Sequence, residues 1–135
     1  MANTEHVELL LRDVDEWNRW REEDPSLVPE LDGADLSGAD LALANLTHAL
    51  LRGANFTLAN LKGADFRGAD LRGANFVGAR LIGVEFAGAD LSGADLSTAE
   101  DLTLEQLGET SGDETTQLPD GCDRPAHWSS LHRLR

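Results

Sequence analysis

The sequence predicts an all-β solenoid, in which the chain winds into stacked coils around a continuous core. Large apolar residues stand at every fifth position from Leu31 to Leu96, fourteen times without a break. From Ala34 onward alanine stands two positions before these residues, with Val84 as the one exception, and Asp or Asn usually lies between the two. Glycine usually follows two positions after the large residue.

A five-residue period does not suit the other regular structures. On an α-helix it turns the side-chain direction by roughly 140° per repeat, so the large residues would point all around the axis. In a flat strand an odd period would send them alternately to opposite faces. A short extended piece followed by a corner solves the problem. Alanine and the large residue then point inward, Asp or Asn points outward, and glycine accepts the positive φ of a type II corner.

The large residues of the repeat are therefore the expected core. The phenylalanines favour four units per coil, because Phe56 would then stack on Phe76 and Phe66 on Phe86, in stacks on opposite walls. Three units per coil would bring no two of them together in adjacent coils. The expected core residues are Leu36, Leu41, Leu46, Leu51, Phe56, Leu61, Phe66, Leu71, Phe76, Leu81, Phe86, Leu91 and Leu96.

The thirteen full units from Ala34 to Thr98, which begin Ala-Asp-Leu-Ser-Gly, resemble the pentapeptide repeat family and its pattern A-(D/N)-L-x-x. The resemblance covers about half the chain and implies a right-handed quadrilateral β-helix, here of about 3.5 coils. Departures from the pattern are local. Leu43 and Leu58 replace the corner glycine, and Leu50 and Arg80 replace the outward Asp or Asn. None of these departures breaks the register.

The open ends of a solenoid expose apolar side chains and unpaired backbone groups, so we expect a cap at each end. This divides the chain into three segments. Residues 1–30 form an N-terminal α-helical cap and connector, residues 31–100 form the β-helix, and residues 101–135 form a C-terminal cap with a short helix and a tail.

The N-terminal cap is predicted as one helix over about residues 5–22, with Asn3 or Thr4 as its N-cap and Pro25 beyond its end. Leu9 and Trp20 project to nearly the opposite side of this helix, where either the connector covers them or a partner protein contacts them. The expected apolar stripe consists of Val7, Leu10, Leu11, Val14 and Trp17.

The repeat loses its phase after Ala99, and Thr103 with Gln106 forms the capping box of one helical turn. We expect the tail to fold back on the last coil as far as about Trp128, with Leu118 and Trp128 as its anchors. The remaining residues are expected to fray.

We expect no enzyme, and no catalytic, cofactor or metal site. The glycines serve corners, the carboxylates lie on flat walls, and the core leaves no lumen for a ligand. The four histidines do not stand at metal-ligand spacing from the single cysteine. Cys122 and His127 could be interpreted as a nucleophile and its base. The alternative, which we expect, is that Cys122 is a tail thiol beside a packing motif.

The chain is expected to be cytoplasmic. Its beginning lacks a basic region and a long apolar run, so we predict no signal peptide. No segment approaches the roughly 18 apolar residues that span a bilayer. A single cysteine excludes an intrachain disulfide and fits a reducing compartment.

The formal net charge is −14, from 11 basic and 25 acidic residues, which disfavours direct binding to nucleic acid or to an anionic membrane. The resemblance implies another use of acidity, because some family members mimic a DNA rod, bind type II topoisomerases and protect them from quinolones. The distribution argues against this function. Residues 31–100 hold only −4 of the net charge, and Arg52 and Arg72 are expected to form a small cationic strip flanked by Asp70 and Asp90.

The predicted function is therefore a non-enzymatic protein-interaction scaffold with an unknown protein partner. A homodimer is one form of this contact, and the alternative is that each outward aliphatic residue is tolerated singly. The candidate contact residues are Leu9, Trp20, Leu43, Leu58, Val77 and Ile82.

Overall fold

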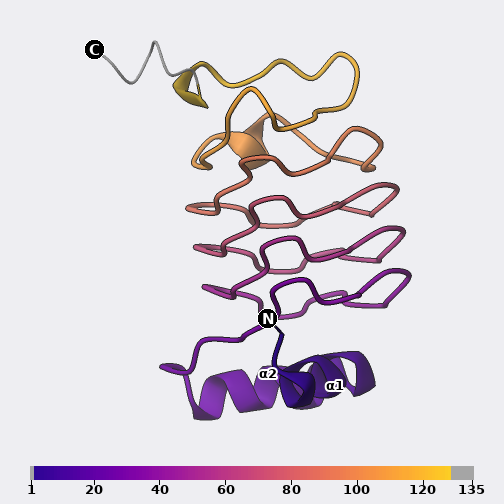
Figure 1. Cartoon of the computed structure of the whole chain (residues 1–135), viewed down its shortest axis with the longest axis vertical. Helices are drawn as coiled ribbons and strands as arrows, with labels where there is room; N and C mark the ends of the chain where they lie inside the picture. Colours follow the sequence, from indigo (N-terminus) through magenta and orange to yellow (C-terminus); the bar gives the residue numbers. More distant parts are fainter. Residues whose placement is uncertain (1, 129–135) are drawn as a thin grey trace.

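The computed structural model describes residues 2–128, which form a β-helix solenoid (Figure 1). The helices α1 (Thr4–Arg12) and α2 (Val14–Glu23) lie together at one end of the stacked coils. The single turns η1 (Glu105–Leu107) and η2 (Ala126–Trp128) belong to the other end. No helix within the described range is long and apolar enough to cross a membrane.

Each repeat unit contributes one outward residue to a β-bridge, and the bridges are parallel. From Glu30 to Glu100 every bridge joins residues twenty positions apart, which is four units. The bridges form four series, and each wall is named here after one member. They are the Asp70 wall (Glu30, Leu50, Asp70, Asp90, Ser111), the Asn55 wall (Asp35, Asn55, Asn75, Asp95, Gln117), the Asn60 wall (Asp40, Asn60, Arg80, Glu100) and the Asp65 wall (Asn45, Asp65, Glu85).

The corners between walls have the expected backbone. Gly38 has a φ of 66°, and the Ala39 N–H closes its turn by donating to the Leu36 carbonyl. Leu43 and Leu58 adopt the same left-handed region, with φ of 65° and 61°, although they carry a Cβ. These two leucines therefore occupy a conformation that costs a non-glycine residue roughly 1–2 kcal/mol.

The outward Asp and Asn residues have a second role that their outward direction alone did not predict. In all ten units that carry Asp or Asn here, the side-chain oxygen accepts a hydrogen bond from the backbone N–H two residues later. This is an Asx turn, which only these two side chains are short enough to form well. The residue type at this position therefore helps to shape the corner.

The core contains the inward alanines and the large residues of the repeat, and none of the thirteen expected core residues is more than 1% exposed. The predicted aromatic stacks are present. Phe56 and Phe76 stack with ring centroids 5.0 Å apart, and Phe66 and Phe86 stack at 5.6 Å. Edge-to-face contacts between the two stacks join opposite sides of the core.

The N-terminal segment forms two helices, where the sequence predicted one. Asp13 ends α1 by donating its backbone N–H to the Leu9 carbonyl, and its carboxylate then caps α2. Within α1 Leu10 is buried, whereas Leu11, predicted within the apolar stripe, is 48% exposed.

Helix α2 contacts the first coil on the Asp65 wall. The Trp17 indole and the Arg21 guanidinium both donate to the Asn45 carbonyl, at 2.8 and 2.9 Å, and Arg21 also reaches the Thr47 carbonyl at 2.9 Å. Asn18 accepts from the Asn45 N–H and donates to the Leu43 carbonyl. These side chains satisfy backbone groups that no preceding coil can pair.

The C-terminal segment folds back over the last coil. The capping box is formed, with Thr103 N–H donating to the Gln106 side chain and Gln106 N–H donating to the Thr103 hydroxyl. Bridges at Ser111 and Gln117 extend the Asp70 and Asn55 walls. Trp128 is buried, and Leu118 is half-buried against the core. The predicted fraying concerns residues 129–135, which lie outside the described range.

Candidate protein-interaction surface

Two corners border the Asn60 wall, and the first of them carries Leu58 and Val77. The two residues are neighbours in adjacent coils, because the Leu58 N–H donates to the Val77 carbonyl at 2.8 Å. Leu58 is 70% exposed, and Val77 is half-buried. This side of the wall therefore presents an aliphatic edge.

The second corner carries Leu43 and Ile82. Leu43 is 70% exposed and Ile82 is 49% exposed. They are two coils apart, and backbone hydrogen bonds from Leu43 to Lys62 and from Gly63 to Ile82 join them. The four solenoid residues that the sequence analysis selected therefore lie on the two borders of one wall.

The corner leucines lie across a glycine of the next coil. A Cβ placed on Gly63 would lie 2.7 Å from Leu43 Cδ2, and a Cβ placed on Gly78 would lie 2.6 Å from Leu58 Cδ2. The leucine side chains thus use the space that a side chain at these glycines would need. They remain exposed on their outer side.

The structure does not bring Leu9 and Trp20 to this wall. Both are half-buried in the helical end and pack against the core. The Trp20 ring lies 5.1 Å from His6 and 5.0 Å from Trp17. Other exposed apolar residues were not selected from the sequence, because the position of a residue in a helix or loop does not reveal its exposure. These residues are Leu11, Leu27, Val28 and Leu104.

The Asn60 wall itself is polar. Its outward residues run Asp40, Asn60, Arg80 and Glu100, and a shallow depression of about 480 Å³ lies over them beside Leu58. Within the described residues, Arg80 and its neighbour Lys62 are the two bases of the solenoid without an ion pair.

Arg52 and Arg72 are neighbours on the Asp70 wall and are flanked by Asp70 and Asp90 as expected, but the expected cationic character is wrong, because both arginines are paired with carboxylates. Arg52 lies 2.8 Å from Asp32 and 3.7 Å from Asp70, and Arg72 lies 2.7 Å from Asp70 and 3.9 Å from Asp90. The side-chain hydrogen bond from Arg72 lowers the pKa of Asp70. The sequence analysis placed the arginines together but did not see that each pairs with two carboxylates. Those of Arg52 lie in the coils before and after it, and those of Arg72 lie in its own and the next coil.

Arg67 is paired in the same way on the Asp65 wall, at 2.6 Å from Asp65 and 3.1 Å from Glu85. Burial would raise the pKa of Asp65, but the hydrogen bonds and charge of Arg67 outweigh it and lower that pKa. The Asn60 wall differs from the Asp70 and Asp65 walls in its charges. Within the described residues its bases Lys62 and Arg80 have no ion pair, and exposed leucines stand at both of its borders.

Comparison with known proteins identifies the family. Residues 30–68 and 59–97 match the family described as Pentapeptide repeats (8 copies). The chain belongs to the pentapeptide repeat family. No curated protein matches this pentapeptide repeat protein.

Several solved pentapeptide repeat proteins are similar to it. One from the thylakoid lumen of Arabidopsis thaliana is 28% identical over 69% of this chain, with a TM-score of 0.37, and one from the cyanobacterium Cyanothece 51142 is 31% identical over 62%, with a TM-score of 0.31. QnrB1, a plasmid-mediated fluoroquinolone resistance protein, is 25% identical over 77%, with a TM-score of 0.41. The matches cover 59%, 60% and 67% of those chains, so this protein spans under two thirds of the first two.

Cys122 and His127 of this pentapeptide repeat protein do not have the features of a nucleophile and its base. Burial, with a contribution from Asp123, raises the pKa of the Cys122 thiol, whereas a reactive thiol has a lowered pKa. The His127 Nε2 lies 2.7 Å from the Thr110 carbonyl and holds the tail against the last coil.

Proposed function

We propose that this pentapeptide repeat protein is a non-enzymatic interaction scaffold that contacts a partner protein through the Asn60 wall and its two aliphatic borders. The exposure of Leu43 and Leu58 carries the proposal. Each is 70% exposed and adopts a left-handed corner conformation that glycine would adopt without strain. Burying a leucine side chain in a contact contributes about 1.5–3 kcal/mol, which offsets that strain.

The polar residues between the borders would give the contact its specificity. Lys62 and Arg80 have no ion pair within the described residues, and Asp40 and Glu100 stand on the same wall. A partner with both acidic and basic groups matches this arrangement. Charge pairs at the rim of an interface act mainly on specificity and association rate.

The test is the double substitution Leu43→Asp/Leu58→Asp, because both side chains are exposed. Affinity capture from lysate of the source cells should lose the partners that bind the parent protein. Leu11→Asp/Leu104→Asp is the matched control, since it adds the same charge at exposed leucines elsewhere. Equal capture by both variants and the parent would exclude this wall as the contact.

Light scattering distinguishes a partner of another kind from a second copy. If the parent protein has the mass of a dimer and Leu43→Asp/Leu58→Asp has the mass of a monomer, the wall joins two copies of this chain. An unchanged mass directs the search to a different protein.

We also propose the detailed form of the scaffold: a right-handed, four-sided β-helix of about 3.5 coils over residues 31–100, with caps formed by residues 1–30 and 101–135. The twenty-residue spacing of the bridges supports four sides. The side chains of α2 that bond to Asn45 and Thr47 support the first cap, and the bridges at Ser111 and Gln117 support the second.

Mimicry of DNA toward a type II topoisomerase is the less favoured function. A DNA mimic needs columns of uncompensated acids, but Arg52, Arg67 and Arg72 each bind carboxylates on the walls. Most of the net charge of −14 comes from the two ends of the chain, not from residues 31–100.

A further inference from the structure

The third coil has an unfinished strand edge on the Asp65 wall. Of the fourteen large residues from Leu31 to Leu96, thirteen donate their backbone N–H to a carbonyl of the next coil, and Phe86 does not. Within residues 2–128 neither the Phe86 N–H nor the corner N–H of Gly83 has an acceptor. The cause is the loss of repeat register after Ala99, because the chain turns into η1 and forms no bridge to Glu85 as the next strand of this wall would.

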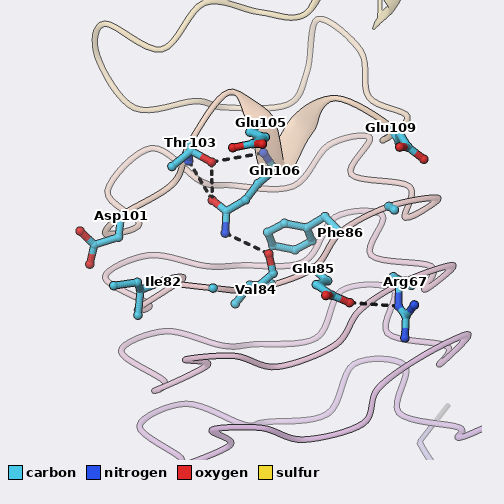
Figure 2. A pocket seen from close by; sticks show the side chains of 12 residues that line it. Arg67, Ile82, Val84, Glu85, Phe86, Asp101, Thr103, Glu105, Gln106 and Glu109 are labelled. Carbon is cyan, nitrogen blue, oxygen red and sulfur yellow. Dashed lines mark hydrogen bonds and ion pairs between the residues drawn. The ribbon is translucent and has the colours of Figure 1, made fainter.

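Gln106 replaces half of the missing strand. Its side-chain amide donates to the Val84 carbonyl at 3.0 Å, as a backbone N–H of the next coil would (Figure 2). The same amide also donates to the Leu81 carbonyl at 2.8 Å. Its oxygen accepts from the Thr103 N–H and therefore does not serve Phe86. The acceptors of this edge are satisfied, and its donors are not.

A groove of about 620 Å³ opens over this edge, between the strand segment at residues 82–87 and η1 (Figure 2). Its border is acidic, with the exposed side chains of Glu85, Asp101, Glu105 and Glu109. Arg67 is the single base that lines it, and it is already bound to Asp65 and Glu85. The groove thus combines unpaired backbone donors with a net negative charge.

We propose that this groove binds an extended segment of a partner protein that carries Lys or Arg side chains. Two carbonyls of the segment, three residues apart, would accept from Gly83 and Phe86. This is the spacing at which Ile82 and Glu85 serve Gly63 and Phe66 one coil earlier. Main-chain bonds would hold the segment as an added strand, and its basic side chains would meet the acidic border.

The energetics favour such an occupant. Phe86 is a buried residue that also lines the groove, and its N–H has no acceptor within residues 2–128. A buried donor without a partner is unfavourable, and a carbonyl brought by a ligand removes that penalty. The site lies beyond the Ile82 corner and does not rest on the proposed contact at the Asn60 wall.

The experiment uses the full chain labelled with ¹⁵N and a fluorescein-labelled peptide of alternating lysine and valine, six residues long. We expect saturable binding by fluorescence anisotropy and a shift of the Gly83 and Phe86 amide signals. Glu105→Lys/Glu109→Lys should weaken binding at least tenfold. Glu8→Lys/Glu23→Lys, the same charge change on exposed residues of the end helices, should leave it unchanged, as should Leu43→Asp/Leu58→Asp.

Four outcomes would overturn the proposal. One is unshifted Gly83 and Phe86 signals, and another is equal weakening by both charge reversals, which would indicate nonspecific attraction. A third is binding that appears only in Arg133→Glu/Arg135→Glu, which would assign the groove to the chain's own basic C-terminal residues. The last is a parent dimer that Glu105→Lys/Glu109→Lys dissociates, which would assign it to a second copy.

Discussion

At the scale of single residues, the corner glycines differ in what surrounds them. Gly38 and Gly78 belong to the same corner, with φ of 66° and 68°, but only Gly78 has the Leu58 side chain over it. Alanine at Gly38 should cost roughly 1–2 kcal/mol for the left-handed φ alone. Alanine at Gly78 should cost more, because Leu58 Cδ2 must also move. Urea unfolding of Gly38→Ala and Gly78→Ala measures the difference.

A third variant separates crowding from backbone strain. In a Leu58→Ala background the obstructing Cδ2 is gone, so Gly78→Ala should cost no more than Gly38→Ala does in the parent. If the excess cost persists in that background, the Leu58 side chain is not its source.

The second residue-scale prediction concerns Asp70. Its hydrogen bond with Arg72 holds its pKa below the ordinary value of about 3.9. A depressed carboxyl pKa stabilises the fold above the unfolded-state value, and this contribution is lost as the pH falls through the folded-state pKa. Carboxyl NMR titration should show the Asp70 pKa rising in Arg72→Gln. The free energy of unfolding of this variant should also fall less than that of the parent protein as the pH drops below 4. The Asp65 pKa should stay where it is, since its partner is Arg67.

At the scale of elements, the docking of α2 depends on side-chain donors. Arg21 is only 6% exposed and donates to the Asn45 and Thr47 carbonyls. Arg21→Ala should destabilise the protein by about 2–4 kcal/mol, because both carbonyls lose a charged donor in a buried site. Arg19→Ala on the exposed face of α2 should change stability little. Thermal unfolding compares the stabilities of the Arg21→Ala and Arg19→Ala variants. If α2 detaches locally, hydrogen exchange at the Asn45 amide should accelerate only in Arg21→Ala.

The repeat made the elements of the solenoid predictable, because one period determines core, corner and outward positions together. The stacks of Phe56 on Phe76 and Phe66 on Phe86 followed from that period together with four units per coil, which the spacing of the phenylalanines favoured. The helix break was not predictable in this way, since Asp13 acts as a cap only when both flanking helices pack on something. The Asx turns were missed because outward direction explains Asp and Asn without invoking hydrogen bonds. The free donor of Phe86 depends on where η1 lies, which no local pattern specifies.

At the scale of the whole molecule, total charge and surface charge lead to different functions. The net charge of −14 by itself suggests a DNA mimic. On the described walls, however, an alternating row runs from Asp32 through Arg52, Asp70 and Arg72 to Asp90. Such a row produces little field beyond a Debye length of about 8 Å at physiological salt. Long-range attraction of a DNA-binding surface is correspondingly weak.

This protein should therefore neither inhibit supercoiling by a type II topoisomerase nor raise the fluoroquinolone concentration that bacteria tolerate. The comparison is with QnrB1, a fluoroquinolone resistance protein, expressed at the same level. The supercoiling assay should include high concentrations of this protein, so that weak binding is not overlooked. Concentration-dependent inhibition, or protection that matches QnrB1, would show that the acidic ends are enough to engage the enzyme despite neutralised walls. In that event Arg52→Gln/Arg72→Gln should strengthen the effect, because removing the bases exposes the carboxylates beside them.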